Sequence, residues 1–271
     1  MFYPTNLRKI PELSLSLPLK MRLARTILPL ILCCLCSCSG AQVKHYRVKV
    51  VKEYPHDRGA YTQGLFFHDG TLYETTGQYG ESSIRTVELE SGKPIIKKQL
   101  SQKYFGEGSC VFEDNLYVLT WTNRVAFRYN PSGLEYIKTV GYSREGWGLT
   151  TNGKSLIASD GTSNLFFLNA NLTLEKKLQV TFNGRPLRNL NELEWIDGKI
   201  WANVYLTDTI VIIDPNSGKV SATVDCKGLL PEKERRRDTD VLNGIAIDEK
   251  GRIYLTGKNW PKLYQIELIE K

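Results

Sequence analysis

The chain of 271 residues is 41% hydrophobic and 24% charged, which is enough apolar material for a full core and excludes an intrinsically disordered chain. Its formal net charge is +7, but residues 1–37 hold five basic residues against a single acidic one, so only +3 belongs to residues 38–271. Such a weak excess argues against a nucleic-acid-binding surface.

The first predicted element is a secretory signal. Residues 21–40, MRLARTILPLILCCLCSCSG, combine a basic start, a ten-residue apolar run and small residues, and the run is too short to span a bilayer. Its LCSC tetrapeptide resembles the lipobox of bacterial lipoproteins, with Cys38 as the lipidated residue. We therefore expect a protein exported to the bacterial cell envelope, in the periplasm or at the cell surface, and held at the membrane through Cys38. Ordinary cleavage that leaves a soluble exported protein is the alternative.

An internal repeat organises the rest of the chain. Five segments contain a short strand, a tight turn and a second strand: QGLFFHDGTLYETTG, EGSCVFEDNLYVLTW, WGLTTNGKSLIASDG, NELEWIDGKIWANVY and NGIAIDEKGRIYLTGK. They recur at steps of 44, 40, 44 and 52 residues, which is the period of a β-propeller blade. Third and fourth strands follow each hairpin, except that the last unit lacks the fourth, while an unassigned strand, HYRVKVV, precedes the first unit.

These units predict an all-β protein, a five-bladed β-propeller whose last blade is closed by the N-terminal strand, so that no open edge remains. The expected boundaries are a signal segment at 1–37, with Met21 as an alternative start of translation, a short tether at 38–45 and the propeller at 46–271.

Equivalent positions of the repeats should form rings around a central channel. The residues that precede the aligned first-strand positions make the first ring: Gln63, Glu107, Trp147, Asn191 and Asn243. Five residues after each second strand begins lies a member of the second ring: Gly77, Trp121, Gly161, Tyr205 and Lys258. Because a structural repeat alone would favour small or apolar residues here, we expect both rings to face one mouth of the channel and to form a binding site.

Glu107 is the strongest candidate for chemistry. Its flanking glycines, Gly106 and Gly108, remove side-chain cover and would let a substrate approach, and the aromatic surroundings should desolvate the carboxylate and raise its pKa. Structural roles compete at the other positions: core packing for Trp121 and Trp147, a solvated blade end for Lys258, and blade-tying hydrogen bonds for Gln63, Asn191 and Asn243.

Absent residue types narrow the chemistry. Only three histidines occur and none lies in the rings, which leaves no histidine metal site and no Ser-His-Asp triad. The rings hold one carboxylate, with Glu74 and Glu192 only nearby, so a glycosidase pair is not supported, and no glycine-rich phosphate loop is present. Cys110 and Cys226 fall on different strands of different blades and are expected as buried or free thiols. Residues 232–240, EKERRRDTD, predict a solvated loop, or alternatively a flap over the channel mouth.

Ten motifs, in this order, resemble the glutaminyl-peptide cyclotransferases of the plant and bacterial type: AYTQGL, YETTGQYGESSIR, YFGEGS, LTW, EGWGLT, SDG, LNELEW, IWANVY, LNGIA and TGKNWPKLY. The resemblance runs from about Tyr46 to the C-terminus. It implies a five-bladed propeller that converts the N-terminal glutamine of peptides or proteins to pyroglutamate and releases ammonia. It also implies that no cofactor and no metal are required, and we expect a monomer.

The resemblance assigns roles to individual residues as well. Glu107, in the FGEG motif, would be the catalytic residue that takes a proton from the attacking α-amine and delivers it to the departing nitrogen. The substrate-binding residues would be Gln63, Tyr61, Trp121, Trp147, Asn191, Tyr205 and Lys258. Two of these depart from the family pattern, because Tyr61 stands where phenylalanine is common and Tyr205 where many members have tryptophan.

Two other functions stay open on the sequence alone. A non-catalytic propeller would bind peptide or carbohydrate at the same mouth. Another hydrolytic propeller enzyme, such as a lactonase or glycosidase, would need a metal or a second essential carboxylate.

Overall fold

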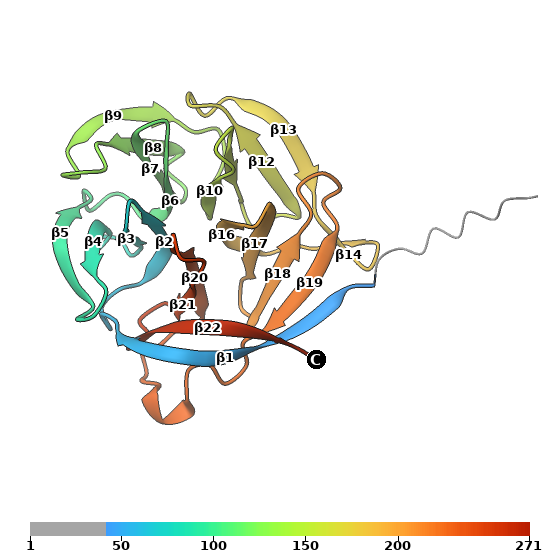
Figure 1. Ribbon diagram of the computed structural model, residues 1–271. Coiled ribbons are helices and arrows are strands. Elements are labelled where there is room, and N and C mark those ends of the chain that lie inside the picture. Colours follow the sequence, from blue (N-terminus) through green and yellow to red (C-terminus); the bar gives the residue numbers. More distant parts are fainter. Residues whose placement is uncertain (1–41) are drawn as a thin grey trace, which may run out of the picture. The chain divides into compact units, whose positions relative to one another are not determined.

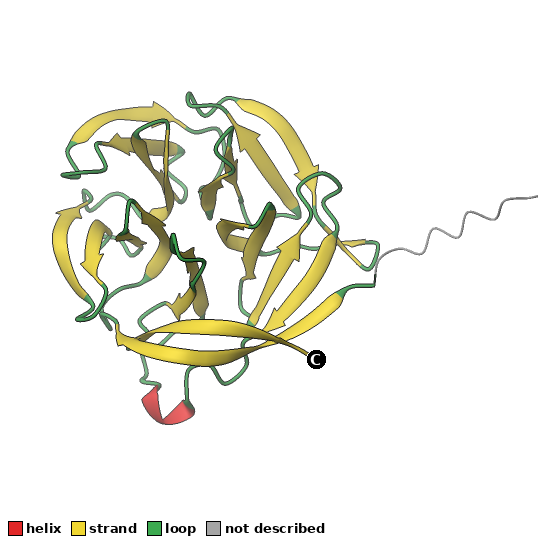
Figure 2. Ribbon diagram, viewed as in Figure 1, coloured by secondary structure: helices red, strands yellow, loops and turns green. Residues whose placement is uncertain are grey.

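The computed structural model describes residues 42–271, a protein built almost wholly of β-strands (Figures 1 and 2). Within this range the only helix is one 3-10 turn at Glu232–Glu234, and no helix there is long and apolar enough to cross a membrane. The predicted all-β class is confirmed. The signal segment at 1–37 and the lipidation residue Cys38 lie outside the described residues.

Three four-stranded antiparallel sheets follow one another along the chain. The first contains β2 (Thr62–His68), β3 (Thr71–Thr76), β4 (Ser83–Glu88) and β5 (Lys93–Gln99). The second contains β6 (Gly106–Phe112), β7 (Asn115–Thr120), β8 (Val125–Tyr129) and β9 (Tyr136–Gly141). The third contains β10 (Leu149–Thr151), β11 (Leu156–Ala158), β12 (Asn164–Leu168) and β13 (Leu174–Gln179).

The remaining strands make one eight-stranded sheet in the order β16-β17-β18-β19-β1-β22-β21-β20 and a small hairpin. The large sheet contains β16 (Leu190–Ile196), β17 (Lys199–Val204), β18 (Thr209–Ile213), β19 (Val220–Asp225), β20 (Leu242–Ile247), β21 (Ile253–Gly257), β22 (Lys262–Glu270) and β1 (Lys44–Pro55). The hairpin pairs β14 (Thr181–Phe182) with β15 (Arg185–Pro186). In Figure 1 the sheets stand around a common centre, with β2, β6, β10, β16 and β20 innermost, which is a propeller-like arrangement.

The N-terminal strand β1 joins the two ends of the chain. It pairs antiparallel with the C-terminal β22 from Tyr46↔Glu270 to Pro55↔Lys262, as the missing fourth strand of the last repeat predicts. It also pairs in parallel with β19 over four residues, and this contact links the two halves of the large sheet. Because β1 begins at Lys44, the last two residues of the expected tether at 38–45 belong to this strand.

Four of the innermost strands change their pairing register near their first residues. The shifts fall between Thr62 and Gly64 in β2, Gly106 and Ser109 in β6, Leu190 and Leu193 in β16, and Leu242 and Ile245 in β20. A shift of this kind takes residues out of the regular alternation and re-aims their side chains. Each shifted segment contains a member of the first ring. The same kind of register shift therefore orients four of the five side chains of that ring.

The glycines beside Glu107 serve packing between strands, which corrects the expectation that they leave room for a substrate. A Cβ on Gly108 would lie 2.5 Å from Leu149 N and 2.6 Å from Trp147 O, and one on Gly106 would lie 2.7 Å from Thr76 O. These neighbouring backbones approach so closely that no side chain fits. The exposed path to Glu107 therefore has to come from the channel mouth.

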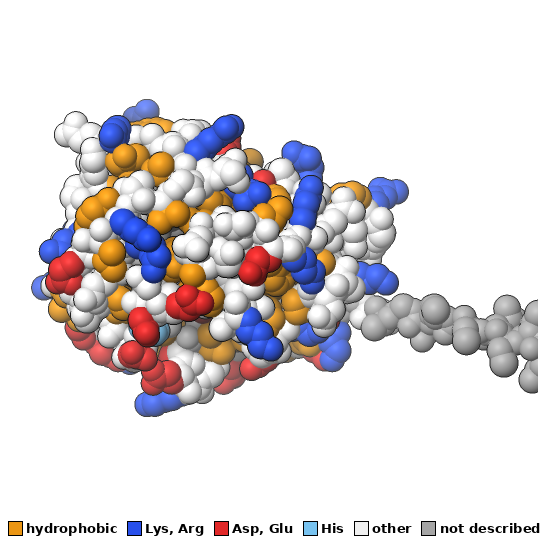
Figure 3. Space-filling view, turned by 90° about the horizontal axis from the view of Figure 1, so that it is seen from above, with side chains coloured by type: hydrophobic (Ala, Val, Ile, Leu, Met, Phe, Trp, Pro, Cys, Tyr) orange, Lys and Arg blue, Asp and Glu red, His pale blue; other side chains and the backbone are white. Residues whose placement is uncertain are grey.

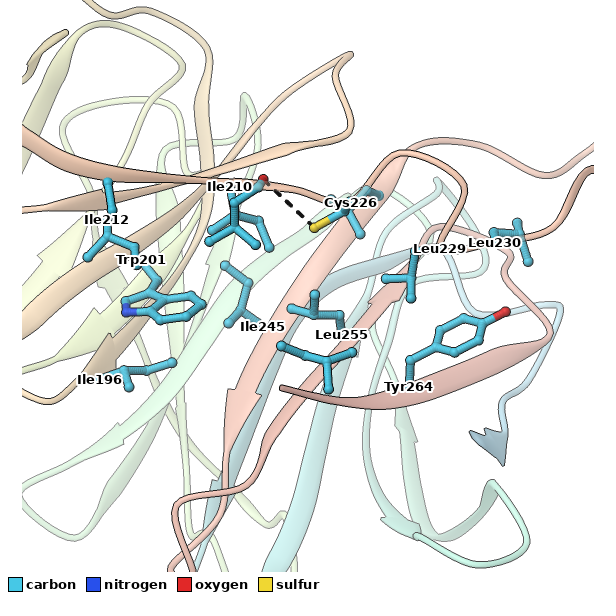
Figure 4. Packing of buried hydrophobic residues seen from close by; sticks show 14 of the residues in the cluster. Ile196, Trp201, Ile210, Ile212, Cys226, Leu229, Leu230, Ile245, Leu255 and Tyr264 are labelled. Atoms are coloured by element: carbon cyan, nitrogen blue, oxygen red, sulfur yellow. Dashed lines mark hydrogen bonds between the residues drawn. The ribbon is translucent and has the colours of Figure 1, made fainter. Parts of the chain in front are cut away.

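Apolar side chains fill the spaces between neighbouring sheets. One cluster joins β16–β19 to β20–β22 and includes Trp201, Ile245 and Tyr264, together with Leu229 and Leu230 from the connecting segment (Figure 4). Cys226 packs in the same cluster, with Sγ 3.9 Å from Val224 O. Cys226 and Cys110 are both buried and free, as the sequence predicts.

The segment at 232–240 is held at the periphery of the sheets. Lys262 Nζ lies 2.7 Å from Glu234 Oε1, and Arg58 Nη1 donates to Glu234 O at 3.1 Å. In the view of Figure 1 the 3-10 turn stands outside the ring of strands, beyond β1 and β22. Side chains of both charge signs are scattered over the face that Figure 3 shows.

Candidate active site

One cavity of about 200 Å³ brings the predicted site together. It is lined by Tyr61, Gln63, Gln78, Phe105, Glu107, Trp121, Trp147, Asn191, Tyr205 and Lys258. All eight residues named from the sequence as catalytic or substrate-binding are among them. The lining residues come from segments spread over almost 200 positions of the chain, and the repeated sheets gather them at one end of the innermost strands.

Glu107 is almost completely buried in this cavity, with 4% of its surface exposed. Burial raises the pKa of its carboxyl well above the ordinary value, and the negative charge of Glu145 adds to this. The ammonium of Lys258 and the side-chain amide of Gln63 act in the opposite direction. The carboxylate of Glu107 is therefore a stronger base than an exposed carboxylate, and a nearby cation stabilises its ionised form.

Lys258 is buried as well, with 3% exposed, so the alternative of a solvated blade end is wrong. Its Nζ lies 4.8 Å from the ring centroid of Tyr61 and 4.8 Å from that of Tyr205, which places the ammonium between two aromatic faces. Burial lowers its pKa, while Glu107 and Asp240 raise it. The cavity thus holds a cation that is stabilised by rings and by a nearby carboxyl.

Asp240, the last residue of the segment at 232–240, contacts the cavity residue Tyr61 from outside the lining. Tyr61 Oη donates to Asp240 Oδ2 at 2.8 Å. Burial, together with this carboxylate, raises the pKa of Tyr61, so its hydroxyl stays protonated. The backbone of Asp240 is fixed in turn, because Trp260 Nε1 donates to its carbonyl at 2.9 Å and its N–H donates to Lys258 O at 3.0 Å.

Phe105 forms the centre of an aromatic wall. Its ring meets those of Tyr61, Tyr79 and Trp121 edge to face at centroid distances of 6.0, 5.5 and 5.7 Å. Gly77 lies against the same ring, and a Cβ there would be only 2.2 Å from Phe105 Cε1. Gly77 therefore makes room for the aromatic wall and does not line the cavity.

Glu145 holds both tryptophans of the cavity. Its Oε2 accepts hydrogen bonds from Trp121 Nε1 at 3.1 Å and from Trp147 Nε1 at 3.3 Å. Trp147 also meets Tyr205 edge to face at 5.6 Å, and it packs on Gly161, where a Cβ would lie 2.7 Å from its ring. Trp121 is 37% exposed at the mouth. Core packing therefore does not account for either tryptophan.

Asn191 and Asn243 have different surroundings, although both belong to the first ring. The Asn191 side chain lines the cavity and is 3% exposed. The Asn243 side chain is outside the lining and ties β20 to β2, with Nδ2 2.9 Å from Thr62 O and 3.1 Å from Gln63 Oε1. The blade-tying interpretation is thus right for Asn243.

Several residues of the site were not singled out from the sequence. Phe105 and Glu145 stand inside the quoted YFGEGS and EGWGLT motifs, so their adjacency to Glu107 and Trp147 was an available signal. Gln78 likewise stands inside the quoted YETTGQYGESSIR motif, next to Gly77 of the second ring. Asp240 had no such signal, because it comes from a loop whose position depends on the folded sheets.

A second group of buried charges lies outside the cavity. His56 Nε2 is 2.8 Å from Glu74 Oε1, and Arg85 lies beside the same carboxylate, with Nε 3.9 Å from Oε2. Glu192 instead accepts the backbone N–H of Ile245 at 2.9 Å. Glu74 and Glu192 thus have structural partners. Among residues 42–271 no three His, Cys, Asp or Glu side chains are grouped as a metal site.

A propeller-like protein whose central cavity combines a buried carboxyl, a buried ammonium and an aromatic enclosure has the make-up of an acid–base site for a small polar group. The chain belongs to the glutamine cyclotransferase family, which matches residues 26–268. It is 43% identical over 229 residues to glutaminyl-peptide cyclotransferase from Arabidopsis thaliana, covering 82% of this chain and 71% of the relative. The crystal structure of Myxococcus xanthus glutaminyl cyclase superposes with a TM-score of 0.80 at 34% identity, covering 85% of this chain and 100% of that one. The resemblance read from the ten motifs is confirmed.

Proposed function

We propose that this chain converts the N-terminal glutamine of peptides or proteins to pyroglutamate and releases ammonia. The observation that carries the proposal is the position of Glu107, a buried carboxyl with a raised pKa in a cavity of about 200 Å³. The names of the two relatives agree with this chemistry.

Ring closure needs orientation before it needs a nucleophile from the protein. The substrate's own α-amine attacks its γ-carboxamide carbon, which makes a five-membered ring, so the enzyme has to hold the side chain in its folded-back conformation. In this proposal Trp121, Trp147 and Tyr205 enclose the glutamine side chain and exclude water. Tyr61 and Phe105 complete the enclosure.

Glu107 then moves the proton. The attacking nitrogen carries a proton that it must lose as the C–N bond forms, and the departing nitrogen needs one to leave as NH3. One carboxylate between the two nitrogens accepts the first proton and donates it to the second, ending in its original state. A raised pKa suits both steps, because the carboxyl then binds the proton firmly enough to accept it and releases it near neutral pH.

Hydrogen-bond donors would stabilise the oxygen that becomes negative in the tetrahedral intermediate. The side chains of Gln63, Asn191 and Lys258 line the cavity and supply such donors. The Lys258 ammonium is fixed between two rings, so little reorganisation is needed when the charge develops. No metal or cofactor is required for these steps.

The experiment that tests the function is direct. Purified protein is incubated with a Gln-initiated peptide, and ammonia release and the loss of 17 Da from the peptide, about the mass of NH3, are followed together. Binding of the peptide without ammonia would favour the non-catalytic propeller. Activity that is lost on adding a chelator would favour a metal-dependent hydrolytic enzyme.

We further propose that the four-stranded units make five blades and that residues 46–271 form a single catalytic domain. In support, β20, β21, β22 and β1 complete a fifth group of four strands beside the other four groups. We also propose a monomer that is exported and anchored through a lipid on Cys38. Its tests are the molecular mass in solution and the release of a Cys38→Ser variant from the membrane fraction.

A further inference from the structure

Asn243 sits behind the cavity, at the contact between β20 and β2. Its side chain has no exposed surface. The amide nitrogen Nδ2 makes two hydrogen bonds, to Thr62 O at 2.9 Å and to Gln63 Oε1 at 3.1 Å. Both contacts join residues about 180 positions apart in the chain.

The carbonyl of Thr62 decides how these amides are oriented. A backbone carbonyl oxygen only accepts hydrogen bonds, so the Asn243 atom that faces it has to be the NH2 group. The same NH2 group faces Gln63, which therefore has to present its oxygen Oε1. Since an amide carries oxygen and nitrogen on opposite sides, Nε2 of Gln63 is directed away from Asn243.

The far side of Gln63 is the cavity. Gln63 lines it together with Glu107, and its amide lowers the pKa of the Glu107 carboxyl. With Nε2 on this side, an N–H of Gln63 is directed into the cavity, as a donor for the carboxylate oxygens of Glu107 and for the substrate. If the Gln63 amide were turned over, two oxygens would face each other and the ionised form of Glu107 would lose a partner.

We propose that Asn243 is a positioning residue for the reaction: by accepting only one orientation of the Gln63 amide, it keeps an N–H donor aimed at Glu107 and at the substrate. This inference rests on the proposed role of Glu107. It gives the buried Asn243 a function beyond tying two strands together, since either orientation of Gln63 would leave the strands joined through Thr62.

Other charged and titratable groups also face Glu107, and the test has to separate them. Lys258 lowers the pKa of Glu107, whereas Glu145 raises it. Tyr61 and Tyr205 stand around the same cavity, and the carboxylate helps to raise their pKa values. None of these contacts passes through Asn243, so a double-mutant cycle with Gln63 isolates the proposed effect.

The experiment measures kcat/KM against pH, by ammonia release, for wild type, Asn243→Ala, Gln63→Leu and the double variant. Loss of a donor to an ionised group raises the pKa of Glu107, so the acid limb of the Asn243→Ala profile should move upward by about one pH unit. In the Gln63→Leu background, Asn243→Ala should cause no further shift. Additive shifts, or an unchanged limb in folded Asn243→Ala, would overturn the proposal.

Asn203→Ala is the matched control. Asn203 is also buried, on β17, and its Oδ1 accepts the N–H of Gly244 at 3.1 Å, next to Asn243 but without contact to Gln63. It should lower Tm and leave the acid limb in place. If Asn243→Ala does not fold, Asn243→Leu keeps the volume and adds no charge. It has no N–H to hold Gln63 in one orientation, so the same upward shift is expected. Wild-type protein that releases no ammonia would instead refute the proposed function, and a Glu107→Gln enzyme with full turnover would refute the proposed role of Glu107.

Discussion

Replacing Glu107 by glutamine separates catalysis from folding more sharply than any other change. The variant keeps the shape and size of the side chain, and with them the packing among Gly106, Gly108 and the neighbouring strands. What it removes is the carboxylate that carries the proton. Because general acid–base catalysis contributes about 10²- to 10⁴-fold, kcat should fall by that factor, or about 3–5 kcal/mol in activation free energy.

The same change should not destabilise the fold. The pKa of Glu107 is raised in the folded protein, so the folded state binds its proton more tightly than the unfolded chain. Stability is therefore lost as the pH rises from the unfolded pKa through the folded one, and at neutral pH the ionised carboxylate opposes folding. Glutamine carries no such charge, so the free energy of unfolding at pH 7 should equal or exceed that of wild type.

The assay combines ammonia release from a Gln-initiated peptide with urea unfolding at pH 7. Glu194→Gln is the control: Glu194 is a buried carboxyl whose pKa is raised to about 8, but it lines another cavity, near the opposite end of its strand. That variant should keep wild-type turnover. Turnover of Glu107→Gln within tenfold of wild type, with the control also active, would refute the assignment of the proton transfer.

Three further outcomes are expected. Lys258→Met removes a cation that lowers the pKa of Glu107, so the acid limb of kcat/KM should move upward by about one pH unit, and an unchanged limb would contradict the pairing. Glu145→Gln removes a charge that raises the same pKa, so pH–rate profiles should show the limb moving downward. Glu74→Gln leaves His56 buried without its partner and should reduce the free energy of unfolding by about 3 kcal/mol, measured in urea at pH 6. Folding lowers the pKa of Glu74 from its ordinary value of 4.5 and raises the pKa of His56 from 6.5. Glu74 therefore contributes stability above its unfolded pKa and His56 below its own, so both contribute at pH 6.

Much of the fold was predictable because its signals are local. Asp-Gly and Asn-Gly turns between alternating apolar runs fix each hairpin, and their regular spacing fixes the order of the sheets. The missing last strand and the spare first one point to the pairing of β1 with β22. The same register placed seven of the cavity residues at one mouth, and the family resemblance added Tyr61.

The remainder depends on contacts that no local pattern contains. A register shift occurs at Asn243 as well as at Gln63 and Glu107, so these positions look equivalent in the sequence. Only the folded structure shows that Asn243, Gly77 and Gly161 lie outside the cavity. Asp240 comes from a charged surface segment, and its reach to Tyr61 follows from the burial of Trp260 beside it. The charged composition of residues 232–240 predicts only a solvated loop.

The pairing of β1 with β22 also bears on how the chain folds. Tyr46 and Glu270 are partners across nearly the whole described chain, so the last group of strands cannot assemble until β22 has been synthesised. Contacts of such large sequence separation form late and slow the folding of a domain, because the intervening chain has to be ordered first. Without β22, the large sheet would be left with unpaired edges on β1 and on β21. The sheet therefore becomes continuous only after β22 has been synthesised.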